Sequence, residues 1–236
     1  MNEIRAIAKR QFRSYFNGPT AYIVLCLVLL ILGFFFWKTF FLIGRASMRE
    51  MFRWLSVISI FSLPALTMGL LAEEKRTGTI ELLITMPVTE AQVIIGKFLG
   101  VLGLFGVLLL LTLPYPISVA TLGDLDWGPV FTGYLGLFFL GAAILAIGLA
   151  ASSATNSPLL AFFVTMTFAF VAWIADKVLP LLPARLATTV QWISFDHHFQ
   201  SMSRGVIDPR DVVFFGSIVA IGLLLAFRAL ESRRWS

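Results

Sequence analysis

The sequence predicts an all-α membrane protein with six transmembrane helices, and three observations lead to this fold class. Of the 236 residues, 58% are hydrophobic and 13% are charged, whereas soluble domains are about 45–50% apolar and about 25% charged. One core of this size cannot bury the excess, because a small globule still exposes much of its surface. The apolar residues fall into runs close to the roughly 20 residues that cross about 30 Å of hydrocarbon. We therefore expect the chain to fold in a lipid bilayer.

The first element is an amphipathic helix at residues 2–17. Its apolar side chains recur at helical spacing and alternate with basic ones, a pattern typical of a helix that lies in the interface of an anionic leaflet. The apolar set is Ile4, Ile7, Ala8, Phe12 and Tyr15, and the basic set is Arg5, Lys9, Arg10 and Arg13. Gly18 and Pro19 end the helix. The run from Thr20 to Ile43 exceeds the roughly 7–15 apolar residues of a signal peptide, so it is the first transmembrane helix.

The remaining runs complete a single transmembrane domain that covers residues 1–236. We expect the spans at about 20–43, 52–72, 98–122, 130–151, 159–179 and 212–227. Pro64 predicts a kink in the second span, and Pro114 and Pro116 predict a bend in the third. Thr89 and Gln92 form a capping-box pattern that starts the helix leading into the third span.

Loop charges predict the orientation. With six spans and both termini in the cytoplasm, ten of the 18 Lys and Arg residues lie in cytoplasmic segments and eight outside. Basic residues favour the cytoplasmic side, so this small excess predicts cytoplasmic termini.

Enzyme motifs are absent from the sequence. His197 and His198 are the only histidines, and adjacent residues on a helix point about 100° apart, so they cannot share a metal as an i, i+4 pair could. Cys26 is the only cysteine and can form no internal disulfide. The nearest match to an ATP-binding loop, from Ala91 to Phe98, lacks the first glycine and the hydroxyl that holds magnesium. We expect no catalytic residue, no metal site and no cofactor in this chain.

Ion-coupled secondary transport is the alternative function. Such transporters place ionisable groups near the bilayer midplane. Here the charged residues associated with the runs fall at their ends: Lys38, Arg53, Asp176, Lys177 and Arg228. This placement disfavours a proton relay, although backbone carbonyls and hydroxyls could still bind sodium.

Small residues form a stripe on the third span. Gly96, Gly100 and Gly103 lie within about 60° of one another on a helix of 3.6 residues per turn. Such stripes let helices approach closely in lipid. Packing within one chain and packing at a dimer face both agree with the pattern.

The segment from Glu73 to Gly100 reads EEKRTGTIELLITMPVTEAQVIIGKFLG and resembles the signature region of type-2 ABC transporter permeases. In that family a charged pair precedes Gly-Thr, an acid-Leu-Leu stretch, a proline and Gly-Lys. The matching positions are Glu74, Arg76, Gly78, Thr79, Glu81, Leu82, Pro87, Gly96 and Lys97. The resemblance implies that this segment forms a cytoplasmic coupling helix that docks on an ATPase subunit.

Other stretches extend the resemblance over nearly the whole chain. FNGPTAYIV, DWGPVFTGYLGLFFLGAAILAIGLAASS and HHFQSMSRGVIDPRDVVFF are similar to the branch that contains the permease associated with bacterial gliding motility. The resemblance implies a half-transporter of the bacterial inner membrane. Two permease chains, identical or one with a large periplasmic domain, would pair and engage two ATPase subunits. ATP and magnesium would be bound by the ATPase, and no nucleic acid is expected as a partner.

The connection between the fifth and sixth spans also matches a family feature. In the family it forms short re-entrant helices that gate the outer face, and Pro180 to Asp208 takes that position here. The resemblance makes five polar residues candidates for the outer gate: Asp196, His197, His198, Arg204 and Asp208.

The coupling segment itself has two faces. On a helix from Thr79 to Met86, Glu81 lies on the polar side, while Ile80 and Leu83 belong to the apolar side. An exposed apolar patch on a cytoplasmic loop marks a partner site, although an anchor in the lipid interface would show the same pattern. Export of a substrate and mechanical work on a periplasmic partner are both consistent with such a transporter.

Overall fold

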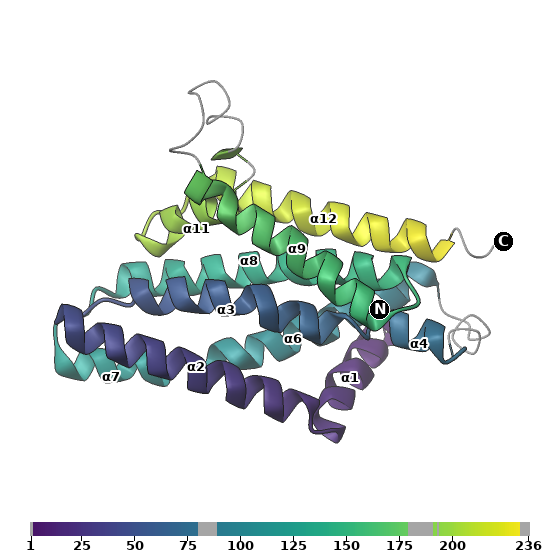
Figure 1. Ribbon diagram of the computed structural model, residues 1–236, viewed down its shortest axis with the longest axis horizontal. Helices are drawn as coiled ribbons and strands as arrows, with labels where there is room; N and C mark the ends of the chain where they lie inside the picture. Colours follow the sequence, from purple (N-terminus) through teal and green to yellow (C-terminus); the bar gives the residue numbers. More distant parts are fainter. Residues whose placement is uncertain (1, 80–88, 179–190, 193, 232–236) are drawn as a thin grey trace.

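The computed structural model describes residues 2–79, 89–178, 191–192 and 194–231, and the regular structure in these ranges is helical. The helices are α1 (Asn2–Asn17), α2 (Thr20–Ile43), α3 (Arg49–Thr67), α4 (Ala72–Arg76), α6 (Glu90–Leu111), α7 (Pro114–Leu122), α8 (Trp127–Ala154), α9 (Pro158–Val178), α11 (Phe195–Ser203) and α12 (Pro209–Glu231). They lie side by side in an elongated bundle (Figure 1).

Within the described ranges, six helical segments are long and apolar enough to cross a membrane, which confirms the predicted fold class at that level. They cover Thr20–Ile43, Arg49–Arg76, Glu90–Leu122, Trp127–Ala154, Pro158–Val178 and Pro209–Glu231. The second segment consists of α3 and α4, and the third consists of α6 and α7.

Two features of the span boundaries agree with the sequence expectation, the capping box before α6 and the interruption at Pro114, whereas the end of α3 at Thr67 was not expected. The helix of the third span begins at Glu90, because the capping box forms: the Gln92 amide donates to Thr89 Oγ1 at 3.3 Å and the Thr89 amide donates to Gln92 Oε1 at 2.9 Å. The helix of the second span stops at Thr67, with a break over residues 68–71 before α4. The third span breaks before Pro114, which has no amide hydrogen and starts α7 instead.

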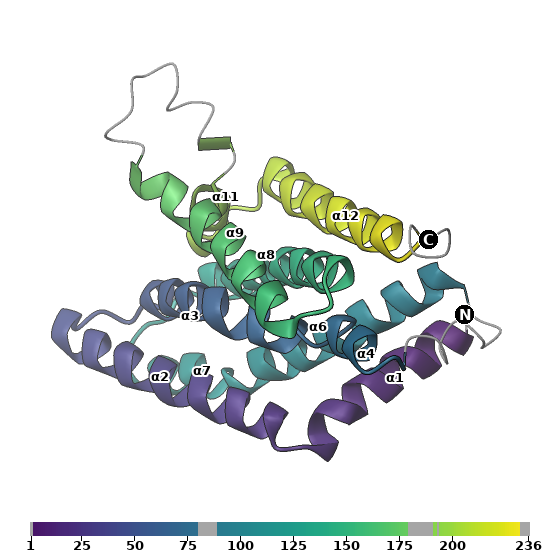
Figure 2. The same ribbon diagram turned by 45° about the vertical axis from the view of Figure 1, so that its right-hand side comes forward.

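Helix α8 lies at the centre of the bundle, with α3, α6 and α12 against it (Figure 2). The glycines of α8 lie where neighbouring helices approach it closely. A Cβ on Gly133 would overlap the ring of Phe52 on α3, and a Cβ on Gly141 would overlap the ring of Phe105 on α6. On the side of α12, a Cβ on Gly222 would stand 2.9 Å from the backbone of α8. Small residues thus bring the neighbouring helices into van der Waals contact, which drives helix association in lipid.

Helix α1 packs its apolar face across α6. The Tyr15 hydroxyl donates to the carbonyl oxygen of Leu66 on α3 at 2.7 Å. Burial raises the pKa of this hydroxyl, which keeps it protonated as a donor. The basic side chains Arg5, Lys9 and Arg13 stay exposed. A helix therefore forms at residues 2–17, and α6 packs against its apolar side.

The two ends of the bundle carry different elements. Helix α1, helix α4 and the last described residues of α12 lie at one end, and the α7–α8 turn and α11 lie at the other (Figures 1 and 2). We call these the α4 end and the α11 end.

Candidate functional site

A serine from α8 fills the break between α3 and α4. The amides of Leu71 and Ala72 both donate to Ser152 Oγ at 3.0 Å, and the Ser152 hydroxyl donates to the carbonyl oxygen of Met68 at 3.0 Å. Buried backbone groups need such partners once a helix stops. One side chain therefore stabilises a break that the helix could not satisfy by itself.

A lysine from α6 reaches the same break. Lys97 is 3% exposed, and its Nζ donates to the carbonyl oxygen of Leu70 at 2.6 Å and lies 2.7 Å from Glu74 Oε1. A buried ammonium is tolerated only when it is paired and hydrogen-bonded, as it is here.

A second lysine, Lys75 of α4, is also buried and donates to the carbonyl oxygen of Ser153 on α8. We refer to Glu74, Lys75, Lys97, Ser152 and Ser153 as the basal polar cluster. It joins α4 to α6 and to α8.

A tight turn follows α4. Thr77 Oγ1 donates to the carbonyl oxygen of Glu73 at 2.9 Å and lies 3.0 Å from Thr79 Oγ1. Gly78 has a φ of 74°, in the left-handed region that favours glycine after a helix. Arg76 pairs with Glu73 at 2.5 Å on the surface.

The glycine stripe of α6 meets α1 of the same chain. A Cβ on Gly96 would stand 2.7 Å from Ile7, and one on Gly100 would stand 2.6 Å from the Cβ of Gln11. Gly103 faces Phe12, with 3.3 Å to the ring. Gln92 Nε2 adds a hydrogen bond to Glu3 Oε2 at 3.3 Å. The start of α6 is thereby held by α1.

At the α11 end, Asp196 is buried and lies 2.5 Å from Lys177 Nζ at the end of α9. Gln200 Nε2 donates to the same carboxylate at 3.1 Å. Arg204 donates to Gln200 Oε1 at 3.2 Å and is exposed. Asp208 accepts the amide of Arg210 at 2.9 Å, a contact that starts α12.

The two histidines take different partners. His198 is buried, with Nδ1 at 2.7 Å from Asp211 Oδ1 and Nε2 at 3.2 Å from the carbonyl oxygen of Trp192. The ring stacks on Phe214 at 4.0 Å between centroids. His197 instead lies 3.2 Å from Gln191 Nε2.

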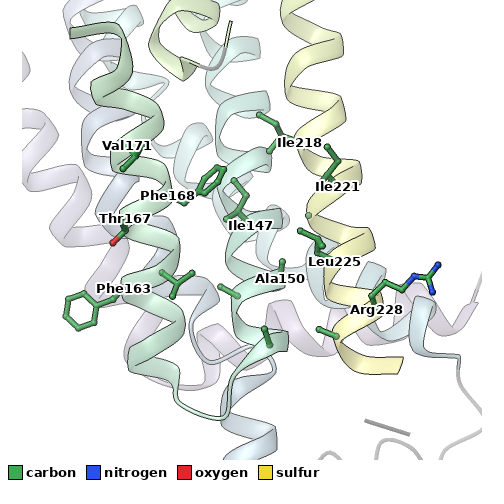
Figure 3. Close-up of a pocket in the computed structure, with 15 residues that line it drawn as sticks. Ile147, Ala150, Phe163, Thr167, Phe168, Val171, Ile218, Ile221, Leu225 and Arg228 are labelled. Carbon is green, nitrogen blue, oxygen red and sulfur yellow. The ribbon is translucent and has the colours of Figure 1, made fainter. Parts of the chain in front are cut away.

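An apolar groove of about 1060 Å³ runs between α9 and α12, over α8. Phe168 and Val171 of α9 form one wall, and Ile221 and Leu225 of α12 form the other (Figure 3). Helix α8 forms its floor, and the guanidinium of Arg228 points away from it (Figure 3). The groove has the chemistry of a surface that contacts lipid chains or another apolar helix.

The sequence model described as ABC-2 family transporter protein matches residues 45–227 of the chain. The chain belongs to the ABC-2 transporter family. No curated protein matches it. The matched range includes α3 to α9, α11 and most of α12, and it contains both the basal polar cluster and the α11 end.

Family membership has direct consequences. The chain is the permease subunit of an ABC transporter and crosses the membrane several times. The ABC-2 family implies an ABC ATPase as the partner, and its permease subunits are typically not catalytic.

The ABC-2 signature residues are only partly described by the structure. Glu74, Arg76, Gly78 and Thr79 lie together in α4 and its turn. Glu81, Leu82 and Pro87 lie outside the described residues, as does the predicted coupling helix for all but its first residue. Of the residues assigned to the outer gate, Asp196 and His198 are buried in polar contacts, while His197, Arg204 and Asp208 make more exposed ones.

Several residues of these clusters were not recognised from the sequence as contributors to a site, among them Lys97, Ser152 and Asp211. Lys97 stands at the start of an apolar run, where a lysine usually reaches out to the interface, and Ser152 belongs to a polar turn. Asp211 stands 13 residues after His198 and pairs with it only in the fold. The sequence offered one signal for these residues: Lys97 matches the family pattern, but the pattern does not say which residue Lys97 contacts.

Proposed function

We propose that this ABC-2 permease engages its ABC ATPase through the segment between α4 and α6, on the cytoplasmic side of a bacterial inner membrane. The observation that carries the proposal is the basal polar cluster. Glu74 precedes residues 80–88 and Lys97 follows them, and an ion pair between the buried lysine and the half-buried glutamate joins the two. A loop that receives force from a partner can transmit it only if its two ends are held together, and the contact between Glu74 and Lys97 holds them together.

The charge distribution supports the orientation. The α4 end carries the exposed basic face of α1, with Arg5, Lys9 and Arg13, and the Arg76–Glu73 pair. Basic residues favour the cytoplasmic side and the anionic inner leaflet. We therefore place the α4 end, with both termini, in the cytoplasm, and the α11 end at the outer face as the gate.

The proposed function also implies an assembly of several subunits. Two permease chains would pair and engage two ATPase subunits, which bind ATP and magnesium, while this chain carries no cofactor. The second permease is either an identical chain or a relative with a large periplasmic domain, as in the gliding-motility branch. The work delivered is export of a substrate or movement of that periplasmic partner.

A capture experiment tests the proposal. The full chain, tagged at its C-terminus and purified from its native bacterium in mild detergent, should bring down an ABC ATPase. In nanodiscs the permease should alter the rate of ATP hydrolysis by that ATPase. A chain that purifies alone, and that takes up solute in proteoliposomes only under a proton or sodium gradient, would instead be a secondary transporter.

A further inference from the structure

The buried Lys97 is not explained by a membrane span alone. Its side chain is 4% exposed and that of its partner Glu74 is 28% exposed, and both lie near the α4 end of segments long and apolar enough to cross a membrane. A charge buried in protein is costly unless it is paired and hydrogen-bonded, so the position of Lys97 needs an explanation. Glu74 Oε2 is also buried and accepts no hydrogen bond from the described residues, so the carboxylate depends on Lys97 for its compensation.

The positions of the two residues give the pair a particular geometry. Glu74 lies on α4 and Lys97 lies on α6, in the second turn after the Thr89 cap. The chain between them leaves α4 through the Thr77–Thr79 turn and returns at Thr89. The ion pair therefore closes this excursion at its base.

Helix α8 is attached to the same base. Ser152 holds the backbone at Met68, Leu71 and Ala72, and the carbonyl oxygen of Ser153 accepts from Lys75. These bonds replace the helical bonds lost at the break between α3 and α4. A displacement of α4 relative to α6 or α8 must break at least one of them.

We propose that Lys97 is a positioning residue that makes the two flanks of the coupling segment move as one unit and passes their displacement to α8. The inference rests on the proposed function, because it requires an ATPase that engages residues 80–88. Lys97 is buried at the base of the coupling segment. It acts through Glu74 and the Leu70 carbonyl, and the output appears at the α11 end.

A purely structural pair would behave differently. Buried ion pairs can often be replaced by well-packed apolar residues with no loss of stability, whereas removal of one partner leaves an uncompensated charge. The double substitution Lys97→Met with Glu74→Leu therefore removes the ion pair without leaving a lone charge, and its remaining cost is the hydrogen bond to the Leu70 carbonyl. The double variant therefore distinguishes an effect on the stability of the fold from an effect on the displacement passed to α8.

The experiment uses nanodiscs that contain the permease and the ABC ATPase that co-purifies with the wild-type chain, in a Cys26→Ser background. Spin labels at Thr77 and Ala91 report on the two flanks, and labels at Thr121 and Arg204 report on the α11 end. Distances are measured without nucleotide and with ATP plus vanadate. The matched control removes an ion pair at the other end of the same bundle, with Arg53→Met and Glu50→Leu, which lie 2.7 Å apart in the structure.

We expect the double variant at positions 74 and 97 to stay folded, with a melting temperature lowered by no more than the loss of the hydrogen bond to the Leu70 carbonyl causes. The distribution of distances between the labels at Thr77 and Ala91 should broaden, and the nucleotide-dependent change in distance at the α11 end should be lost. The control should keep both. A double variant that retains the full change at the α11 end overturns the inference, and so does one that loses its fold, because the pair would then be structural.

The proposed function fails by a different result. If the wild-type chain captures no ATPase, or if its captured ATPase does not respond to it, the docking proposal is wrong before any variant is compared. If the wild-type chain captures and stimulates the ATPase, and the double variant still shows the full nucleotide-dependent change at the α11 end, only the role proposed for Lys97 is wrong.

Discussion

At the scale of single residues, Ser152 makes three hydrogen bonds with the backbone at the break between α3 and α4. It accepts two amides and donates to one carbonyl, all at 3.0 Å, and it is fully buried. Ser152→Ala leaves these backbone groups without a partner, and each unsatisfied buried group costs about 1–3 kcal/mol. We expect a clear loss of thermal stability in detergent.

Ser217→Ala is the matched control, because Ser217 is exposed on α12 and donates only to Phe214 of its own helix. Its effect should stay within about 0.5 kcal/mol. Equal melting temperatures for the two variants would show that the break between α3 and α4 does not depend on Ser152.

Glu81 gives a prediction about the partner rather than about the fold. A docking acid sets the register of an interface and its association rate more than its affinity. Glu81→Lys should leave the permease folded in the membrane and should weaken ATPase capture or uncouple hydrolysis from work. Co-purification and hydrolysis rates in nanodiscs measure both effects.

Glu50→Lys, at the α11 end of the second span, is the control for that charge reversal. It should leave capture unchanged. If Glu81→Lys also leaves capture, stimulated hydrolysis and cellular activity normal, the segment is better described as an anchor in the lipid interface.

At the scale of elements, the contact between α1 and α6 depends on glycine. A Cβ at Gly100 would stand 2.6 Å from the Cβ of Gln11 and 3.0 Å from the carbonyl oxygen of Ala8, so Gly100→Leu must push α1 away. Overpacking of this kind costs about 1–3 kcal/mol. We expect a lower melting temperature and faster proteolysis within α1.

The same helix provides the control. Gly106 has nothing within 4 Å of its Cβ position, so Gly106→Leu should change neither property. If the two variants behave alike, α1 does not lie on α6, and the glycine stripe faces lipid or a second chain.

At the scale of the whole molecule, the proposed orientation is the assignment on which both proposals depend. Single cysteines are introduced in a Cys26-free chain at Asp124, between α7 and α8, at Asp208, between α11 and α12, and at Thr77, directly after α4. An impermeant thiol reagent added to intact cells with a permeable outer membrane should label the first two. Labelling of position 77 alone would reverse the orientation and remove the coupling assignment.

The sequence by itself determined the features that are encoded in short windows. Hydropathy over about 20 residues gave six spans, since crossing the hydrocarbon requires that length in any helix. The Thr89–Gln92 capping box and the break before Pro114 also followed from local chemistry. The coupling segment was identified from its family pattern, and residues 80–88 of it lie outside the described structure.

Only the tertiary structure decided which side chains meet. Lys97 finds the Leu70 carbonyl 27 residues away, and Ser152 finds Leu71 at a separation of 81. His198 pairs with Asp211 rather than with its neighbour His197. The glycine stripe could have faced another chain, but it faces α1. Hydropathy places each of these residues on a helix, whereas its partner depends on how helices far apart in the sequence pack around α8.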